Sequence, residues 1–234
     1  MDTVYPARCM GCGDVVDTDF GLCGPCWRDT AFIGGAVCDR CGVPLPGDVQ
    51  AGDAMCDGCL KHPKPWDQGR AAILYRDAGR KLVLALKHGD RQEIARPAAK
   101  WMAQVAKELV DADTLIAPIP LHWARMMSRR YNQSALLARA LGVEMGKDIC
   151  LDLLSRPRRT RSLDGLKQAQ RQATLEGAIT VTDKRLSVLQ GRSVLLVDDV
   201  MTSGATLSAA THALQRAGAG RICVVVLARV TQEA

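Results

Sequence analysis

Two adjacent carboxylates and a run of hydroxyl-bearing residues lie close together in the last part of the chain. Asp198 and Asp199 follow the apolar run 194–197, and residues 202–206 read Thr-Ser-Gly-Ala-Thr. Backbone N–H groups at the start of a helix attract a phosphate, and Ser and Thr hydroxyls supply further donors. Paired carboxylates accept hydrogen bonds from a vicinal diol or act as outer partners of Mg²⁺. These residues predict a site for a ribose 5-phosphate group, made of Asp198, Asp199, Thr202, Ser203, Gly204, Ala205 and Thr206.

A buried strand and the helix after it are the elements that must position this site. The continuously apolar run 194–197 is typical of a strand that is covered on both faces in a parallel sheet. Apolar residues then recur at helical spacing from Leu207 to Ala217, and Gly218 favours a helix end. In open α/β sheets ligands bind beyond the carboxyl ends of strands, where this acid pair stands. The alternative is a solvated strand end followed by a helix N-cap.

A group of arginines follows a second predicted strand. Residues 115–120 are apolar and predict a buried strand, and Arg125, Arg129 and Arg130 come soon after it. We expect these arginines at the same edge of the sheet as Asp198. The planar guanidinium bonds two oxygens at once, so the three residues are predicted to bind pyrophosphate. The alternative is an ordinary solvated basic loop.

A third segment, residues 156–171, is strongly basic. It holds six cations and one acid and lacks apolar periodicity over most of its length. A mobile loop of this kind could close over a leaving group and exclude water, with Arg159 and Arg171 stabilising pyrophosphate as it departs. The same loop could instead follow a nucleic-acid backbone.

Eight of the ten cysteines lie within the first 59 residues as four Cys-x₂-Cys pairs. Without a secretory signal, metal binding is favoured over disulfides. Two such pairs complete a tetrahedral zinc site that has no open position, so two structural zinc ions are predicted. We assume that Cys9, Cys12, Cys23 and Cys26 bind one ion and that Cys38, Cys41, Cys56 and Cys59 bind the other. An interleaved pairing has the same spacing and stays open.

The composition predicts a soluble, cytoplasmic protein with two parts. No apolar run approaches the length of a membrane span, and the N-terminus does not read as a signal peptide. Residues 1–60 hold three Arg and nine Asp, so the excess of positive charge belongs to the rest of the chain. Residues 61–66 read as a linker. We therefore predict a double zinc ribbon at 1–62, with Trp27, Phe32 and Ile33 filling its small core, and an α/β domain at 63–234.

The order of these motifs resembles one protein family over nearly the whole chain. The stretch 194–207 is similar to the phosphoribosyl pyrophosphate (PRPP) signature of type I phosphoribosyltransferases, with Ser203 in place of a Thr. Together with the cysteine pairs, Ile119-Pro120-Leu121-His122 and Arg130-Tyr131-Asn132-Gln133, it resembles the ComF family of competence-related proteins. That resemblance implies a type I phosphoribosyltransferase-like parallel sheet flanked by helices, preceded by the double zinc ribbon. It also implies PRPP with Mg²⁺ as ligand and a link to DNA uptake.

Two functions of different classes fit these expectations. The first is an enzyme that transfers a phosphoribosyl group from PRPP to an unidentified nitrogen nucleophile, with Asp198, Asp199, Arg159 and Arg171 as catalytic residues. The second is a non-catalytic accessory protein that uses the same fold to bind a nucleotide or single-stranded DNA, alongside DNA-uptake proteins. A fold does not decide between them.

Overall fold

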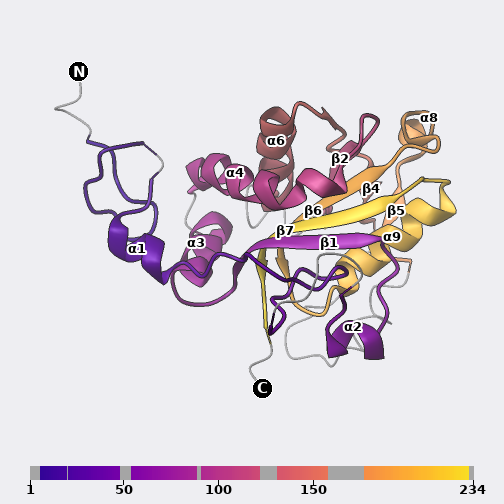
Figure 1. Cartoon of the computed structure of the whole chain (residues 1–234). Helices are drawn as coiled ribbons and strands as arrows, with labels where there is room; N and C mark the ends of the chain where they lie inside the picture. The colour runs from indigo at the N-terminus through magenta and orange to yellow at the C-terminus, as the bar shows by residue number, and fades with distance from the viewer. Residues whose placement is uncertain are drawn as a thin grey trace.

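The computed structural model describes residues 6–19, 21–47, 54–88, 91–121, 131–157 and 177–231. Within these residues five parallel strands form a sheet in the order β1-β7-β6-β2-β3, with helices on both faces (Figure 1). The strands are β1 Gln68–Leu74, β2 Leu115–Pro118, β3 Asp148–Ile149, β6 Val194–Met201 and β7 Ile222–Arg229. The predicted fold class, a parallel sheet flanked by helices, is confirmed. None of the helices in these ranges combines the length and the apolar composition of a membrane span.

Three helices cover one face of the sheet. They are α3 Asp77–His88, α4 Ala95–Ala106 and α6 Gln133–Met145, and the short turns η1 Gln92–Ile94 and η2 Lys107–Leu109 flank α4. Leu82 and Leu86 of α3 and Leu137 of α6 are fully buried, in one cluster with Leu195 and Val197 of β6. Apolar residues at helical spacing therefore meet alternate residues of the central strand.

The opposite face is covered by one long helix and by part of the N-terminal region. Helix α9, Ala205–Arg216, buries Leu207 and Leu214 in a cluster that contains Val194 and Leu196, the other two apolar residues at the start of β6. Cys38, Cys41, Cys59 and Trp66 belong to the same cluster. A strand covered on both faces explains why the run 194–197 is continuously apolar.

The remaining elements are short. The antiparallel pair β4 Leu154–Ser155 and β5 Thr180–Val181 lies outside the main sheet, followed by η3 Asp183–Arg185 and α8 Leu186–Leu189. In the N-terminal region, helices α1 Gly24–Asp29 and α2 Asp57–Lys61 each start next to a cysteine. Bridges between Arg8 and Val15 and between Val37 and Pro44 close two small hairpins. The boundary after residue 62 stays a prediction.

The aromatic residues predicted to fill the ribbon core do not do so. Trp27 is 53% exposed, and the Phe32 ring lies between Trp27 and Trp101 of α4, with centroids 4.5 Å and 5.1 Å away. Ile33 donates its backbone N–H to the Ala72 carbonyl of β1 at 2.9 Å. The segment around Phe32 runs antiparallel along the outer edge of β1, and the Phe32 ring packs on the cluster of α3, α4 and α6. Ile33 is instead buried in one cluster with Cys38, Cys41 and Cys59.

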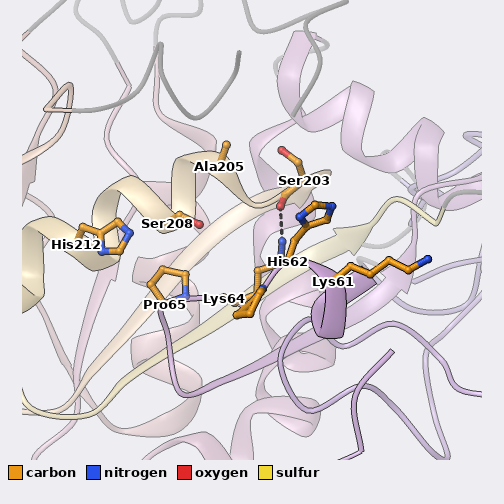
Figure 2. Close-up of a pocket in the computed structure, with 9 residues that line it drawn as sticks. Lys61, His62, Lys64, Pro65, Ser203, Ala205, Ser208 and His212 are labelled. Carbon is orange, nitrogen blue, oxygen red and sulfur yellow. Dashed lines mark hydrogen bonds between the residues drawn. The ribbon is translucent and has the colours of Figure 1, made fainter. Parts of the chain in front are cut away.

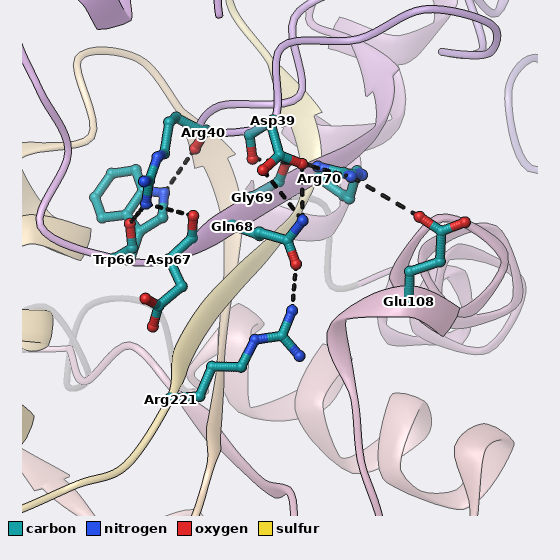
Figure 3. Close-up of polar contacts among 9 residues, drawn as sticks. All are labelled: Asp39, Arg40, Trp66, Asp67, Gln68, Gly69, Arg70, Glu108 and Arg221. Atoms are coloured by element: carbon teal, nitrogen blue, oxygen red, sulfur yellow. Dashed lines mark hydrogen bonds and ion pairs between the residues drawn. The ribbon is translucent and has the colours of Figure 1, made fainter. Parts of the chain in front are cut away.

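The second cysteine region is joined tightly to β1 (Figure 3). Trp66 is 1% exposed and its Nε1 donates to the Arg40 carbonyl at 2.6 Å, while Arg40 donates back to the Trp66 carbonyl at 2.6 Å. An ion pair of 2.8 Å joins Arg70 to Asp39. A Cβ atom on Gly69 would lie only 2.5 Å from the Arg40 carbonyl oxygen, so this close approach requires glycine. The region around Asp39 and Arg40 is thus part of the structural core.

Candidate functional site

Strand β6 carries the acid pair to the carboxyl edge of the sheet, and two helices supply its partners. Asp198 Oδ1 accepts a hydrogen bond of 2.8 Å from Ser134 Oγ of α6 and one of 2.9 Å from the backbone N–H of Asp199. Asp199 is 8% exposed, and its Oδ1 lies 3.2 Å from Nζ of Lys87 in α3. Each carboxylate is therefore held by a different helix on the same face of the sheet.

The surroundings of Asp198 favour its neutral form. Burial, followed by the charge of Asp199, raises the pKa of Asp198 to about 7, although the Ser134 hydrogen bond and the Lys87 charge act in the opposite direction. Near neutral pH, Asp198 therefore exists in both protonation states. A bound group that donates hydrogen bonds to Asp198 favours the ionised form.

This pKa shift gives the protein a specific pH dependence of stability. Because the pKa of Asp198 rises from 3.8 to about 7 on folding, its contribution is fully present below 3.8 and is lost as the pH rises through about 7. Relative to Asp198→Asn, we expect the wild type to lose about 1.4 kcal/mol of unfolding free energy per pH unit over this window. Urea unfolding of both proteins at several pH values measures the difference. A difference that stays constant with pH would contradict this assignment.

The loop after β6 has the geometry of an anion cradle. Gly204 adopts the left-handed conformation at φ 80°, and α9 begins at the next residue without a side-chain cap. Ser203 Oγ is buried and has no hydrogen-bond partner among the described residues. The first N–H groups of a helix have no partner within the helix. The loop therefore offers unused donors beside a positive helix end, which fits a phosphate.

Two cationic side chains donate hydrogen bonds to the backbone carbonyl groups of the same loop. Nη1 of Arg229, at the end of β7, donates to the carbonyls of Met201 and Thr202 at 3.0 Å and 2.8 Å. Lys64 Nζ donates to the Ser203 carbonyl at 2.9 Å. These bonds fix the direction of the peptide groups before the ligand arrives, which lowers the entropic cost of binding.

Gly204 is predicted to be the least replaceable residue of the loop. A Cβ atom there would lie 2.8 Å from Cη2 of Trp66, in addition to the strain of a positive φ. We expect Gly204→Ala to destabilise the protein by about 3–4 kcal/mol, combining backbone strain with overpacking. Gly218→Ala is the matched control, because Gly218 has φ 79° with open space around it; we expect about 1–2 kcal/mol. If a denaturant titration showed that both variants lose the same free energy of unfolding, the Trp66 contact would not contribute to the effect of Gly204→Ala.

The cysteines form two separate groups of four. The Sγ atoms of Cys9, Cys12, Cys23 and Cys26 lie within 4.8 Å of one another, and so do those of Cys38, Cys41, Cys56 and Cys59. The structure thus brings together consecutive pairs, not interleaved ones. Backbone N–H groups of Gly11 and Cys23 donate to Cys9 Sγ at 3.3 Å and 3.2 Å. Four thiols at this separation, with amide donors to the sulfur, fit structural zinc.

Backbone donors around Cys9 favour its thiolate form. Burial alone would raise the pKa of Cys9, but hydrogen bonds from the backbone of Cys23, Cys12 and Gly11 lower it to about 6. A thiolate is the form that binds metal.

The predicted arginines lie outside the described residues. These are Arg125, Arg129, Arg130, Arg159 and Arg171, and their roles stay predictions. The connection next to them is described: Asn132 caps α6 by accepting from the Ser134 backbone at 3.0 Å, and it donates to the Ile119 carbonyl at 3.0 Å. The end of β2 and the start of α6 are therefore fixed relative to each other.

Comparison with known proteins places this architecture in a family. Residues 1–60 match the double zinc ribbon domain, and residues 94–234, more than half of the chain, match the phosphoribosyl transferase domain. The chain is 27% identical to Competence protein F of Haemophilus influenzae, over 98% of this chain and 100% of that protein. The chain belongs to the ComF family.

Other ComF relatives are similar along most of their length. DNA utilization protein YhgH of Salmonella typhi is 30% identical over 90% of this chain and 91% of its own, and Competence protein ComFC of Bacillus subtilis is 27% identical over 86% and 80%. Among solved structures, the ComF chain is similar to glutamine PRPP amidotransferase from B. subtilis, with a TM-score of 0.41 and 18% identity. That likeness covers 62% of this chain and only 30% of the amidotransferase.

Proposed function

We propose that this ComF protein binds PRPP with Mg²⁺ between β6 and α9 and transfers its phosphoribosyl group to an unidentified nitrogen nucleophile. The observation that carries the proposal is the buried Ser203 hydroxyl, which has no hydrogen-bond partner among the described residues and lies in an uncapped helix-start loop a few residues after the acid pair. A 5-phosphate on the loop would use the unpaired donors. The ribose hydroxyls would then donate to Asp198 and Asp199.

Lys87 has a positioning role in this proposal. Its ammonium lies 3.2 Å from Asp199 and offsets part of the negative charge at the edge of the sheet, where an anionic ligand must approach. Magnesium would neutralise the pyrophosphate, and the predicted Arg125, Arg129 and Arg130 would stabilise it as it departs. Arg159 and Arg171 would act from the basic loop that closes over it.

Calorimetric titration of Mg²⁺ and PRPP into the intact zinc-loaded protein tests binding. We expect Ser203→Ala to weaken binding about tenfold, since one hydrogen bond to a charged group is worth about 1.4 kcal/mol or more. Ser155→Ala is the matched control, because Ser155 lies on β4, outside the main sheet, and should leave the affinity unchanged. Absence of binding heat in the wild type would refute the proposal.

A second candidate function is favoured by charge and by the relatives. Residues 61–234 carry a net charge of +12, which suits an anionic polymer, and several relatives are named for competence or DNA utilization. In this alternative the protein is an accessory that binds a nucleotide or single-stranded DNA without catalysis. Salt-dependent affinity for single-stranded DNA that persists in Asp199→Ala, without release of pyrophosphate from PRPP, would favour it. Pyrophosphate release that Asp199→Ala abolishes would favour the enzyme.

A further inference from the structure

A cavity of about 390 Å³ opens between the linker after α2 and the first turns of α9 (Figure 2). Its polar lining comes from segments far apart in the sequence, with Lys61 from the end of α2, His62 and Lys64 from the linker, and Ser208 and His212 from α9. Among the residues that the structure describes, no acidic residue lines it. A recess lined by one sign of charge concentrates anions.

This cavity extends from the start of α9, where Ser203 and Ala205 line it, along one side of the helix. Ser208 and His212 are four residues apart and share one side of the helix, while Leu207 and Leu214 face the core. Ser203 contributes its backbone carbonyl, which accepts from Lys64, whereas its hydroxyl points away from Lys64 in Figure 2. The Ser203 hydroxyl, which we assign to the PRPP phosphate, is therefore not directed toward Lys64.

The groups in the cavity suit a phosphate joined to a flat, partly apolar body. Lys64 uses one of its three ammonium donors on the Ser203 carbonyl. One ring nitrogen of His212 lies 3.2 Å from the Gln215 side chain, which leaves the other for a ligand. The rings of Pro63 and Pro65 supply apolar wall, and Gln215 fixes the Pro65 carbonyl at 2.9 Å. The volume falls in the range of pockets that hold small molecules.

We propose that this cavity binds a nucleoside monophosphate, with its phosphate held by Lys64, Ser208 and His212 and its base against the proline rings. Binding would place the ligand on Lys64, which also bonds the loop that ends at Gly204. The site would thus share the loop at Ser203 and Ala205 with the PRPP site, but it would not include the acid pair Asp198 and Asp199. The proposal does not depend on PRPP binding.

Titration with AMP, followed by calorimetry, tests the site in the intact zinc-loaded protein. Ser208→Asp places a carboxylate in the cavity, and its position in the first turn of α9 is favourable for helix stability. The double variant Lys61→Gln/His212→Gln removes two exposed lining groups. The matched control is Lys100→Gln/Arg216→Gln, which removes two exposed cations that do not line the cavity. Thermal melting of each variant verifies folding.

We expect AMP to bind the wild type, both cavity variants to weaken binding at least tenfold, and the control to retain it. Asp198→Asn should also retain AMP binding, and this result separates the cavity from the PRPP site. Three results would overturn the proposal: AMP affinity that the cavity variants leave unchanged, AMP binding that Asp198→Asn abolishes, or binding of single-stranded oligonucleotides with none of AMP. Inorganic phosphate that binds as tightly as AMP would also overturn it, because the nucleoside would then contribute nothing.

Discussion

Asp199→Ala is expected to abolish binding of PRPP with Mg²⁺ and to lower the free energy of unfolding by about 3 kcal/mol. Two separate causes produce these effects. The carboxylate is a predicted acceptor for the ribose diol, so its loss removes charge-assisted hydrogen bonds from the ligand. It is also the partner of Lys87, whose side chain is only 19% exposed, so the substitution leaves a largely buried ammonium unpaired.

A double variant separates the two effects of the Asp199 substitution. Lys87→Met/Asp199→Ala removes both charges, so we expect most of the lost stability to return while PRPP binding stays absent. Denaturant unfolding measures the first effect and calorimetry the second. If Asp199→Ala bound PRPP within about threefold of the wild type, Asp199 would have no role in the ligand site. If the double variant were as unstable as Asp199→Ala, the unpaired Lys87 would not be the cause.

Cys38→Ser/Cys41→Ser is expected to prevent cooperative folding of the whole α/β domain. Cys38 and Cys41 have no exposed surface and lie in the apolar cluster that includes α9 and β6. Loss of the second zinc would leave unpaired polar groups there and release the contacts of Arg40 with Trp66. Metal analysis should give one zinc per chain in place of two, and the unfolding transition should lose its cooperativity.

Cys12→Ser/Cys23→Ser is the matched control for that experiment. It also removes two ligands from one group of four, but Cys12 is exposed and Cys23 is half-buried. The first group lies beside α1 and α3, at the far end of the molecule from α2 (Figure 1). We expect the loss of one zinc with a cooperative transition and PRPP affinity retained. Equal damage from both pairs of substitutions would show that the two metal sites are not structurally different.

The sheet and the acid pair were predictable because their signals are local. The apolar run 194–197 carries its own indication of a strand covered on both faces, and β6 places Val194 and Leu195 on opposite sides as expected. The acids directly follow that run, so their place at the carboxyl edge follows from the parallel topology alone. Cysteine spacing likewise predicted the knuckles without knowledge of the fold.

The partners of the site were not predictable, because they come from distant parts of the chain. Lys87 lies at the end of α3 and Ser134 at the start of α6. Nothing local indicates that both reach β6. The prolines and lysines before Trp66 predict a linker there, yet Trp66 is 1% exposed and contacts Gly204. Composition shows where regular structure stops, but not what an irregular segment packs against.

The shared core of the second cysteine region and α9 constrains synthesis of the protein in the cell. The cysteines of the second group leave the ribosome before α9 and β7 and can take up zinc first, but the apolar side formed by Cys38, Cys41 and Cys59 stays uncovered until α9 and β7 have been made. The nascent chain therefore carries an exposed apolar surface until β7 has been synthesised. The second cysteine group can bind zinc before the domain is complete. Bound zinc does not cover the apolar side of this group, which α9 and β7 must cover.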